Sequence, residues 1–192
     1  RHRSPSRRTM GLRLGIFGHL GWAVAVTASP GHEVVDRRRI ELLEPGLPNA
    51  PVHHPDQGLG LADIEDVVAR VRASAARMTS ASLDELAAAL PGPVESVHLR
   101  ALPAGFPTDI AVLLRAPHEA RADAIMYRQV LVRAAEARGW QVRFYDAKTI
   151  EAEASALLGR HADEVLHRPR ERLGPPWTKD HRTALAATIL AR

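Results

Sequence analysis

The stretch "LGIFGHLGWAVAV", residues 14–26, constrains the fold more than any other part of the chain. It holds two short apolar runs on either side of the glycine-rich turn "GHLG", a pattern typical of a β-hairpin. A second turn, "SPGH" at residues 29–32, leads into a further strand-like run at residues 33–43. The chain is therefore predicted to open with an antiparallel meander of three strands.

The third strand of this meander carries charge on both faces. Side chains alternate across a strand, so Asp36 and Arg38 lie on one face while Arg37 and Arg39 lie on the other. Charged edges discourage unwanted pairing with other strands. We therefore expect this strand at an edge of the sheet.

After the meander, helical and strand-like patterns alternate, which indicates an α/β fold with a mixed sheet. Residues 44–60 lack periodicity and are predicted as a loop. Residues 82–90 either extend the preceding helix or restart it behind a capping box of Ser82 and Glu85. Residues 110–117 fit a short strand or a turn of helix equally well. The other predicted elements are helices at 64–78, 119–138, 149–158 and 178–191, and strands at 94–102 and 140–146.

Length and charge together predict one domain with a local, rather than global, basic character. A chain of 192 residues suffices for a single core, placed here at residues 10–192. The chain has 26 Lys and Arg against 22 Asp and Glu, but four of the arginines fall in residues 1–9, a basic tail predicted to be disordered. The remainder is neutral overall, so any contact with a polyanion must use a local patch.

Cysteine is absent, which excludes disulfides, thiolate metal sites and a cysteine nucleophile. No apolar run approaches the roughly 20 residues that span a bilayer, so no membrane partner is expected. The expected location is cytoplasmic. The alternative is export through an N-terminal signal at residues 6–29, which contains the twin arginines Arg7 and Arg8.

Three stretches carry a resemblance to the ribonuclease H-like superfamily, and within it to the Holliday-junction resolvases. Residues 14–26 are similar to the first hairpin of that family, residues 127–159 to its helix–strand–helix middle, and "KDHRTALAAT", residues 179–188, to its last helix. The resemblance implies a ribonuclease H-like fold. It also implies Mg²⁺-dependent nuclease chemistry, in which several carboxylates hold two ions.

The acidic positions of that family are poorly matched here. Its first-strand acid falls on Phe17, which cannot bind a hard cation. Its fourth-strand acid falls at residues 97–98, with Glu95 close by, and its last helix matches at Asp180 but has Thr183 at the inner position. Loss of one carboxylate weakens the hold on the second ion, so Phe17 predicts that the usual two-metal catalysis is gone.

Other carboxylates offer an alternative catalytic set. Asp109 follows the fourth strand, Asp146 ends the fifth and Asp180 opens the last helix, so all three could approach one sheet edge and hold Mg²⁺. In the simpler interpretation these aspartates occupy turn and first-turn positions that aspartate favours in any case. Apart from this Mg²⁺, no cofactor is expected.

The loop at residues 44–60 contains two weaker motifs. His53, His54 and Asp56 are suited to Zn²⁺ or Mn²⁺, but no further ligand at a suitable spacing completes a set of four. The "GLG" at residues 58–60 precedes a helix but follows no strand, which argues against dinucleotide binding. Both motifs favour a solvated loop.

A basic segment near the C-terminus is the candidate nucleic-acid patch. Arginine matches phosphate geometry, and tryptophan can stack on a base. The alternative is an ordinary solvated surface, since protein surfaces are rich in charge. The candidate residues are Arg168, Arg170, Arg172, Trp177, Lys179 and Arg182.

Three functional hypotheses remain. The preferred one is a nucleic-acid-associated or protein-binding module with a ribonuclease H-like fold that has lost two-metal catalysis. The first alternative is an active, structure-selective nuclease using Asp109, Asp146 and Asp180. The second is a structural subunit that pairs with another chain, in a homo-oligomer or with a protein partner, through the charged strand at residues 36–41.

Overall fold

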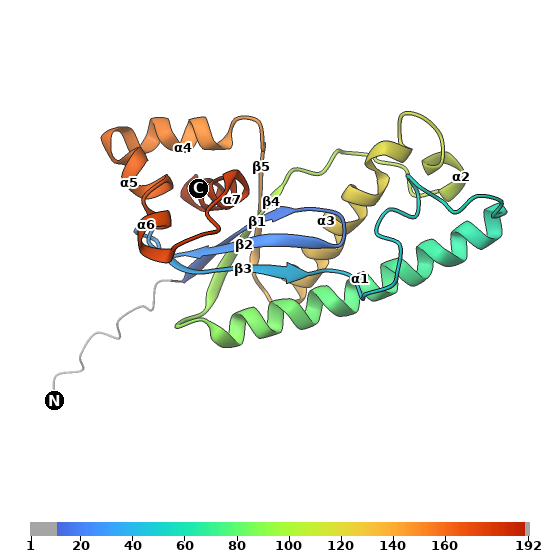
Figure 1. The fold of residues 1–192 in the computed structure, drawn as a ribbon, viewed down its shortest axis with the longest axis horizontal. Coiled ribbons are helices and arrows are strands. Elements are labelled where there is room, and N and C mark those ends of the chain that lie inside the picture. Colours follow the sequence, from blue (N-terminus) through green and yellow to red (C-terminus); the bar gives the residue numbers. More distant parts are fainter. Residues whose placement is uncertain (1–10, 191–192) are drawn as a thin grey trace.

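A computed structural model describes residues 11–190, which form a five-stranded mixed sheet with helices on both faces (Figure 1). The strand order is β3-β2-β1-β4-β5; β2 runs antiparallel to its neighbours, whereas β1, β4 and β5 are parallel. This order and these directions are those expected of a ribonuclease H-like fold, and the predicted α/β class and opening meander are confirmed. The strands are β1 Leu12–Gly18, β2 Trp22–Ala28, β3 Val34–Glu41, β4 Val94–Arg100 and β5 Gln141–Tyr145.

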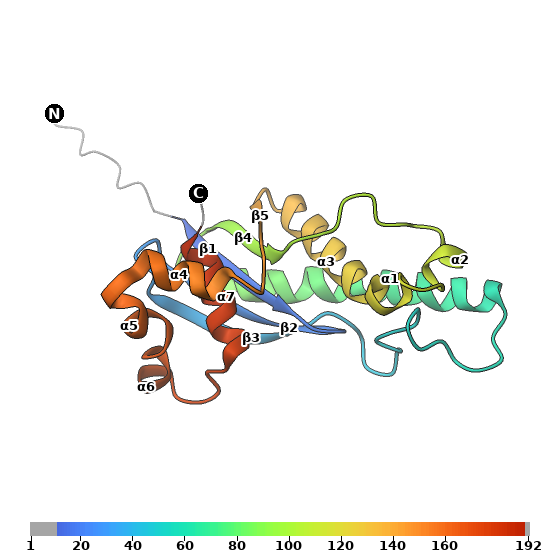
Figure 2. The same ribbon diagram turned by 90° about the horizontal axis from the view of Figure 1, so that it is seen from above.

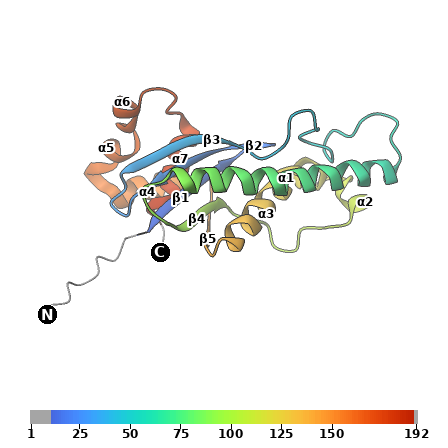
Figure 3. The ribbon, with the colours of Figure 1, turned by 90° about the horizontal axis from the view of Figure 1, so that it is seen from below.

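The helices lie on opposite faces of this sheet. The long helix α1 and helix α3 cover one face, and α7, supported by α4, covers the other (Figures 1 and 3). Among residues 11–190, no helix is both long enough and apolar enough to cross a membrane. The helices are α1 Leu61–Ala89, α2 Ile110–Leu113, α3 Glu119–Ala137, α4 Ile150–Leu158, α5 Ala162–Leu166, α6 Pro169–Leu173 and α7 Lys179–Ile189, with a 3-10 turn η1 at Gly159–His161.

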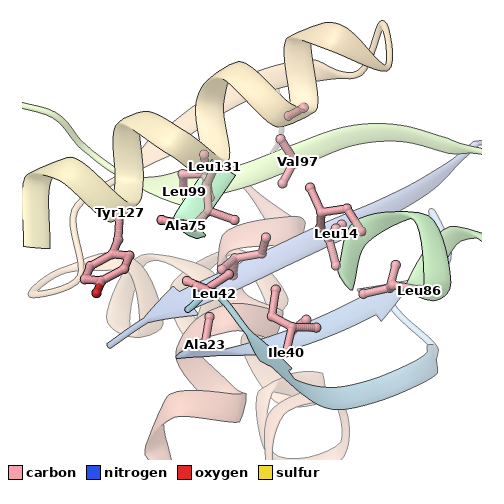
Figure 4. Close-up of a cluster of buried hydrophobic side chains, with 14 of the residues drawn as sticks. Leu14, Ala23, Ile40, Leu42, Ala75, Leu86, Val97, Leu99, Tyr127 and Leu131 are labelled. Atoms are coloured by element: carbon pink, nitrogen blue, oxygen red, sulfur yellow. The ribbon is translucent and has the colours of Figure 1, made fainter. Parts of the chain in front are cut away.

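The core between the sheet and α1 follows from the alternation of the strands. Leu14 on β1 and Ile40 on β3 point to the same face, where Leu86 of α1 and Leu131 of α3 meet them (Figure 4). All four side chains are buried. Alternating apolar residues on the strands and a three-to-four spacing on the helices therefore place this core as the sequence indicates.

On the other face, α7 packs directly on the backbone of β1. A Cβ atom built on Gly15 would lie 1.8 Å from the carbonyl oxygen of Ala184, so only glycine permits this approach. Thr178 is the N-cap of α7, as expected, and the ring of His181 accepts the backbone N–H of Thr178 at 3.2 Å. The contact at Ala184 holds the middle of α7 against β1.

Beyond the sheet, α1 continues into an arm that it forms with α2, the first half of α3 and the loop before α1 (Figures 1 and 2). The 29 residues of α1 extend for about 43 Å at 1.5 Å per residue. Asp123 of α3 ties the loop to the arm by accepting the backbone N–H groups of Val52 at 3.2 Å and His53 at 2.9 Å. The arm has a small core of its own: Val52, Ile64, Val68, Leu113 and Ala122.

Several local expectations are resolved by tertiary contacts. Residues 82–90 extend α1 rather than restart it, and Ser82 donates to the carbonyl oxygen of Glu41 at 2.7 Å instead of capping a helix. The ambiguous residues 110–117 contain the short helix α2, capped by Asp109. The segment 160–176, for which no helix was expected, contains α5 and α6.

The charged strand β3 lies at the sheet edge, as predicted. Its charges are matched within the chain: Arg38 contacts Asp36 at 2.8 Å and Arg39 contacts Glu41 at 2.6 Å. Arg37 donates to the backbone carbonyls of Leu173 and Gly174, among others, and so holds the linker between α6 and α7. The basic tail at residues 1–9 lies outside the described residues.

Candidate nucleic-acid interface

The carboxyl ends of β1, β4 and β5 meet at one edge of the sheet because these strands are parallel. The register pairs Gly15 with His98, and its continuation sets Phe17 beside Arg100. Arg100 in turn pairs with Tyr145 of β5. A phenyl ring, a guanidinium and a phenol thus follow one another along this edge.

A histidine–aspartate pair closes the edge on the side of α7. The turn after β1 carries His19, whose Nε2 lies 2.8 Å from Oδ2 of Asp180, the second residue of α7. The backbone N–H of His19 donates to the carbonyl of Trp22 at 2.8 Å, which fixes the turn. The ring centroid of Phe17 lies 5.4 Å from that of His19.

The His19 ring is one of three flat groups that stack on one another, with Trp22 in contact with both others. It lies parallel to the ring of Trp22, with centroids 4.0 Å apart and an interplanar angle of 9°. The guanidinium carbon of Arg39 lies 4.1 Å from the Trp22 ring centroid, a cation–π contact. His19 is therefore positioned by contacts with its ring face as well as by Asp180.

A cavity of about 200 Å³ opens at this edge, between the strand ends and α3. Phe17, His19 and Arg100 line it from the sheet, and Tyr127 and Arg128 line it from α3. Phe17 is only half-buried, so part of its ring faces outward. The cavity presents aromatic surface and arginines side by side.

The charge at the cavity is predominantly positive. Burial, and then the positive charges of Arg100 and Arg121, lower the pKa of Arg128. Arg128 donates to the carbonyls of Ala124 and Ala101, which fixes its guanidinium. Among residues 11–190, no carboxylate lies within ion-pair distance of any of these three arginines. Such a group of arginines attracts phosphate.

Tyr145 contributes shape rather than charge. Its hydroxyl donates to the carbonyl of Ile16 at 2.8 Å, which ties β5 to β1 across the cavity floor. Burial raises the pKa of Tyr145 above its ordinary value, so the phenol stays protonated and neutral.

The residues at this edge do not fit a pair of Mg²⁺ ions. Such a site needs several convergent carboxylates, whereas Phe17 is apolar, Arg100 is cationic and Asp180 is already engaged with His19. Within the described part of the chain, no three His, Cys, Asp or Glu side chains are arranged to hold a metal ion. This edge is therefore not suited to chemistry through such ions.

The three aspartates of the alternative catalytic set occupy separate local structures. Asp109 lies in the arm, where it caps α2 by accepting the backbone N–H of Val112 at 3.0 Å. Asp146 follows β5 and accepts the backbone N–H of Lys148 at 2.8 Å. Asp180 contacts His19. Each carboxylate thus has a local role, and the structure does not gather the three into one ligand group.

The other residues near the expected fourth-strand acid also lie away from this edge of the sheet. Glu95 is at the opposite end of β4, beside Gly11. Val97 belongs to the core, and His98 is buried with Nε2 3.0 Å from Oγ of Ser96. None of these residues reaches the cavity at the carboxyl end of β4.

The motif of His53, His54 and Asp56 is an exposed loop, as favoured. The two imidazole rings contact each other, with centroids 4.2 Å apart. All three side chains are exposed, and they are not part of a metal-binding group among residues 11–190.

The basic segment near the C-terminus differs from the predicted patch. Trp177 was expected to be available for stacking on a base, and this is wrong: it is only 7% exposed and its Nε1 donates to the carbonyl of Leu166 at 2.8 Å. Arg172 donates to the carbonyl of Val34 at 3.0 Å, and Arg182 contacts Glu151 at 2.9 Å. The remaining members of the patch are exposed: Arg168, Arg170 and Lys179.

Sequence reasoning missed Arg100 and Arg128, which line the cavity, and Arg121, whose charge acts on Arg128. The sequence patterns place Arg100 only in a strand, and Arg121 and Arg128 only in a helix. The signal that identifies Arg100 is its position as the last residue of a strand parallel to β1, level with Phe17. Arg121 and Arg128 lie seven positions apart, which places them on one helix face two turns apart.

No family model matches the chain, and no curated protein matches it significantly. Among solved structures, it is similar to RuvC of T. thermophilus, determined in complex with a Holliday junction substrate. The two are 15% identical, with a TM-score of 0.47, and the match covers 93% of this chain and 90% of that chain.

Proposed function

We propose that this protein binds nucleic acid through backbone phosphates at the carboxyl edge of β1 and β4, and that it does so without two-metal cleavage. One observation carries the proposal: Phe17 and Arg100 line the same cavity at the strand ends, where the family that the sequence resembles would hold metal ions with carboxylates. A cation in this place favours a phosphate and disfavours Mg²⁺.

The arginines supply the phosphate contacts. Arg100 is exposed at the cavity, and Arg128 lines it with a guanidinium held by the carbonyls of Ala124 and Ala101. Arg121 is exposed outside the lining, and its charge acts on Arg128. Guanidinium groups donate in pairs to phosphate oxygens, and each contact releases counterions from the nucleic acid. Because residues 10–192 carry no net charge, binding rests on this local group.

The half-buried ring of Phe17 supplies a second kind of contact. It lies beside Arg100 at the mouth of the cavity, where an unpaired base could stack on it. Trp22 is not available for this role, because its ring already stacks on His19 and contacts the guanidinium of Arg39. We therefore expect a preference for branched or partly single-stranded DNA over plain duplex.

The binding test uses fluorescence anisotropy with a labelled four-way DNA junction over a range of salt concentrations. The variant Arg100→Gln should weaken binding about tenfold and lower the salt slope by about one, since each phosphate contact contributes roughly one. Arg70→Gln, an exposed arginine of α1 outside the cavity lining, is the matched control. Equal affinity of both variants would overturn the assigned surface.

The cleavage test incubates the same junction and an RNA–DNA hybrid with the protein in Mg²⁺ or Mn²⁺. We expect intact substrate in every lane. Cleavage that is lost in Asp146→Asn or Asp180→Asn would instead support the alternative, an active nuclease.

A further inference from the structure

Helix α3 separates two cavities. One side of the helix, at Tyr127 and Arg128, lines the cavity at the sheet edge. Another side, at Met126, Val130 and Arg133, faces a different cavity that is shared with α1. This second cavity contains no residue of the proposed nucleic-acid surface.

The second cavity is a groove between two helices. α1 and α3 form its walls, and Pro107 and Thr108, from the segment between β4 and α2, also line it. Its volume is about 400 Å³. Pockets for small organic molecules fall in this range, and the spaces between packed helices are among their common places.

The floor of the groove is apolar. It consists of Ala76 on α1 and Met126, Val130 and Ala134 on α3. Small side chains on both helices create the hollow, while the flexible Met126 can adapt to the shape of an occupant. This floor offers an apolar ligand a surface to cover.

Arginines surround this floor, and no acidic residue lines the groove. Arg72 of α1 and Arg133 of α3 are exposed, and no carboxylate among residues 11–190 lies within ion-pair distance of either. Arg138 differs, because it is held by Asp84 at 2.7 Å and by the carbonyl of Ser80 at 2.8 Å. Arg138 thus builds the wall, while Arg72 and Arg133 are available to a ligand.

We infer that this groove binds a small organic anion with an apolar body and a carboxylate, sulfonate or phosphate head. The apolar floor accounts for the body, and the two arginines account for the head. A bare inorganic anion would leave the floor uncovered, and a neutral apolar molecule would leave both guanidiniums unused. The site therefore selects for both properties in one molecule.

The probe for the test is 8-anilinonaphthalene-1-sulfonate, an aromatic anion whose fluorescence rises on an apolar surface. Ala76→Phe fills the groove with a ring from an exposed position, and should weaken dye binding at least about tenfold, or 1.4 kcal/mol. Ala73→Phe, also exposed on α1 but outside the groove, is the matched control and should bind as the unmodified protein does. Equal dye affinity of the two variants would overturn the site.

A second variant tests the charge separately from the shape. Arg72→Gln with Arg133→Gln changes only exposed side chains, so folding is preserved, and it too should weaken dye binding. Decanoate should displace the dye from the unmodified protein, whereas inorganic phosphate and decanol should not. Displacement by phosphate or decanol as effective as that by decanoate would show that head and body are not recognised together.

The groove and the nucleic-acid surface can fail independently. Ala76→Phe should leave binding of the four-way junction unchanged, because Ala76 lies on α1 and lines only the groove. Loss of junction binding in this variant, with its thermal stability intact, would mean that the groove is part of the nucleic-acid surface and would overturn its assignment to a small anion.

Discussion

His98 is a buried histidine among positive charges. It is 3% exposed, and Oγ of Ser96 is its side-chain hydrogen-bonding partner at 3.0 Å. Burial, and then the charges of Arg13 and Arg143, lower the pKa of His98 to about 4. The folded protein therefore holds this imidazole in its neutral form at pH values where an unfolded chain would protonate it.

This shift makes the folded state sensitive to acid. Because the folded pKa is the lower one, the contribution of His98 is fully present above about pH 6.5 and is lost as the pH falls toward 4. Between pH 7.5 and 5 the loss should reach about 2 kcal/mol in the free energy of unfolding. Urea unfolding at the two pH values measures it.

The matched variant for this measurement is His98→Gln, which keeps a polar group beside Ser96 but does not titrate in this range. Its stability should fall less between pH 7.5 and 5 than that of the unmodified protein. His181 and His32, whose pKa values are also lowered mainly by burial, remain in both proteins and cancel in the comparison. Parallel pH profiles would refute the role given to His98.

At the scale of elements, the contact of β1 with α7 depends on a glycine, Gly15, which has no side chain to separate them. In Gly15→Ala, the added methyl group would overlap the carbonyl of Ala184, and backbone atoms cannot rotate away. The helix must move off the sheet, at a cost of about 3 kcal/mol or more, since overpacked cores lose 1–3 kcal/mol even where side chains can adjust. Thermal unfolding of the variant reports the loss.

The same strand provides the control for this prediction. A Cβ atom on Gly18 would meet nothing within 4 Å. Gly18→Ala should therefore change the melting temperature little, although it lies only three residues away. A comparable loss in both variants would indicate a general intolerance of β1 to side chains rather than the contact with Ala184.

Helices and strands with a clear hydrophobic periodicity can be predicted from the sequence, whereas the positions where one element ends and the next begins cannot. The alternation of β1 and β2, the charged edge of β3 and the cap of α7 at Thr178 all agree with the structure. The sequence does not decide whether α1 continues through Ser82, because a serine that caps a helix and one that bonds a neighbouring strand look alike in the sequence. Tertiary contacts decide such positions.

At the scale of the whole molecule, the residues of the candidate site can be identified only when the pairing register of the strands is known. Phe17 was identified from the sequence alone, but its neighbour Arg100 was not, because only the parallel pairing of β1 and β4 sets the two level. Trp177 failed as a predicted stacking residue for a related reason: its segment has no period that separates a buried face from an exposed one. A site whose residues come from strands far apart in the sequence can be predicted only after the sheet topology is known.

The arm and the sheet have separate cores, so they should respond separately to mutation. Asp123→Ala removes the acceptor of two backbone N–H groups, at Val52 and His53, which costs about 1–3 kcal/mol when such donors stay buried. We expect faster amide hydrogen exchange in the loop before α1 and in α2, with unchanged protection in β1. Asp66→Ala, an exposed carboxylate of α1, is the control.

Faster exchange across β1 as well would show that the arm and the sheet open together. In that case the small core around Ile64 and Leu113 would not be a separate cooperative unit.

Helix α1 takes part in both cores without interruption: Ile64 and Val68 pack in the arm, whereas Leu83 and Leu86 pack under the sheet. Bending the arm would require breaking consecutive backbone hydrogen bonds of this helix. The proposed anion groove and the strand ends therefore keep a constant separation, and a molecule seated in one is carried at a set distance and angle from a strand of nucleic acid held at the other.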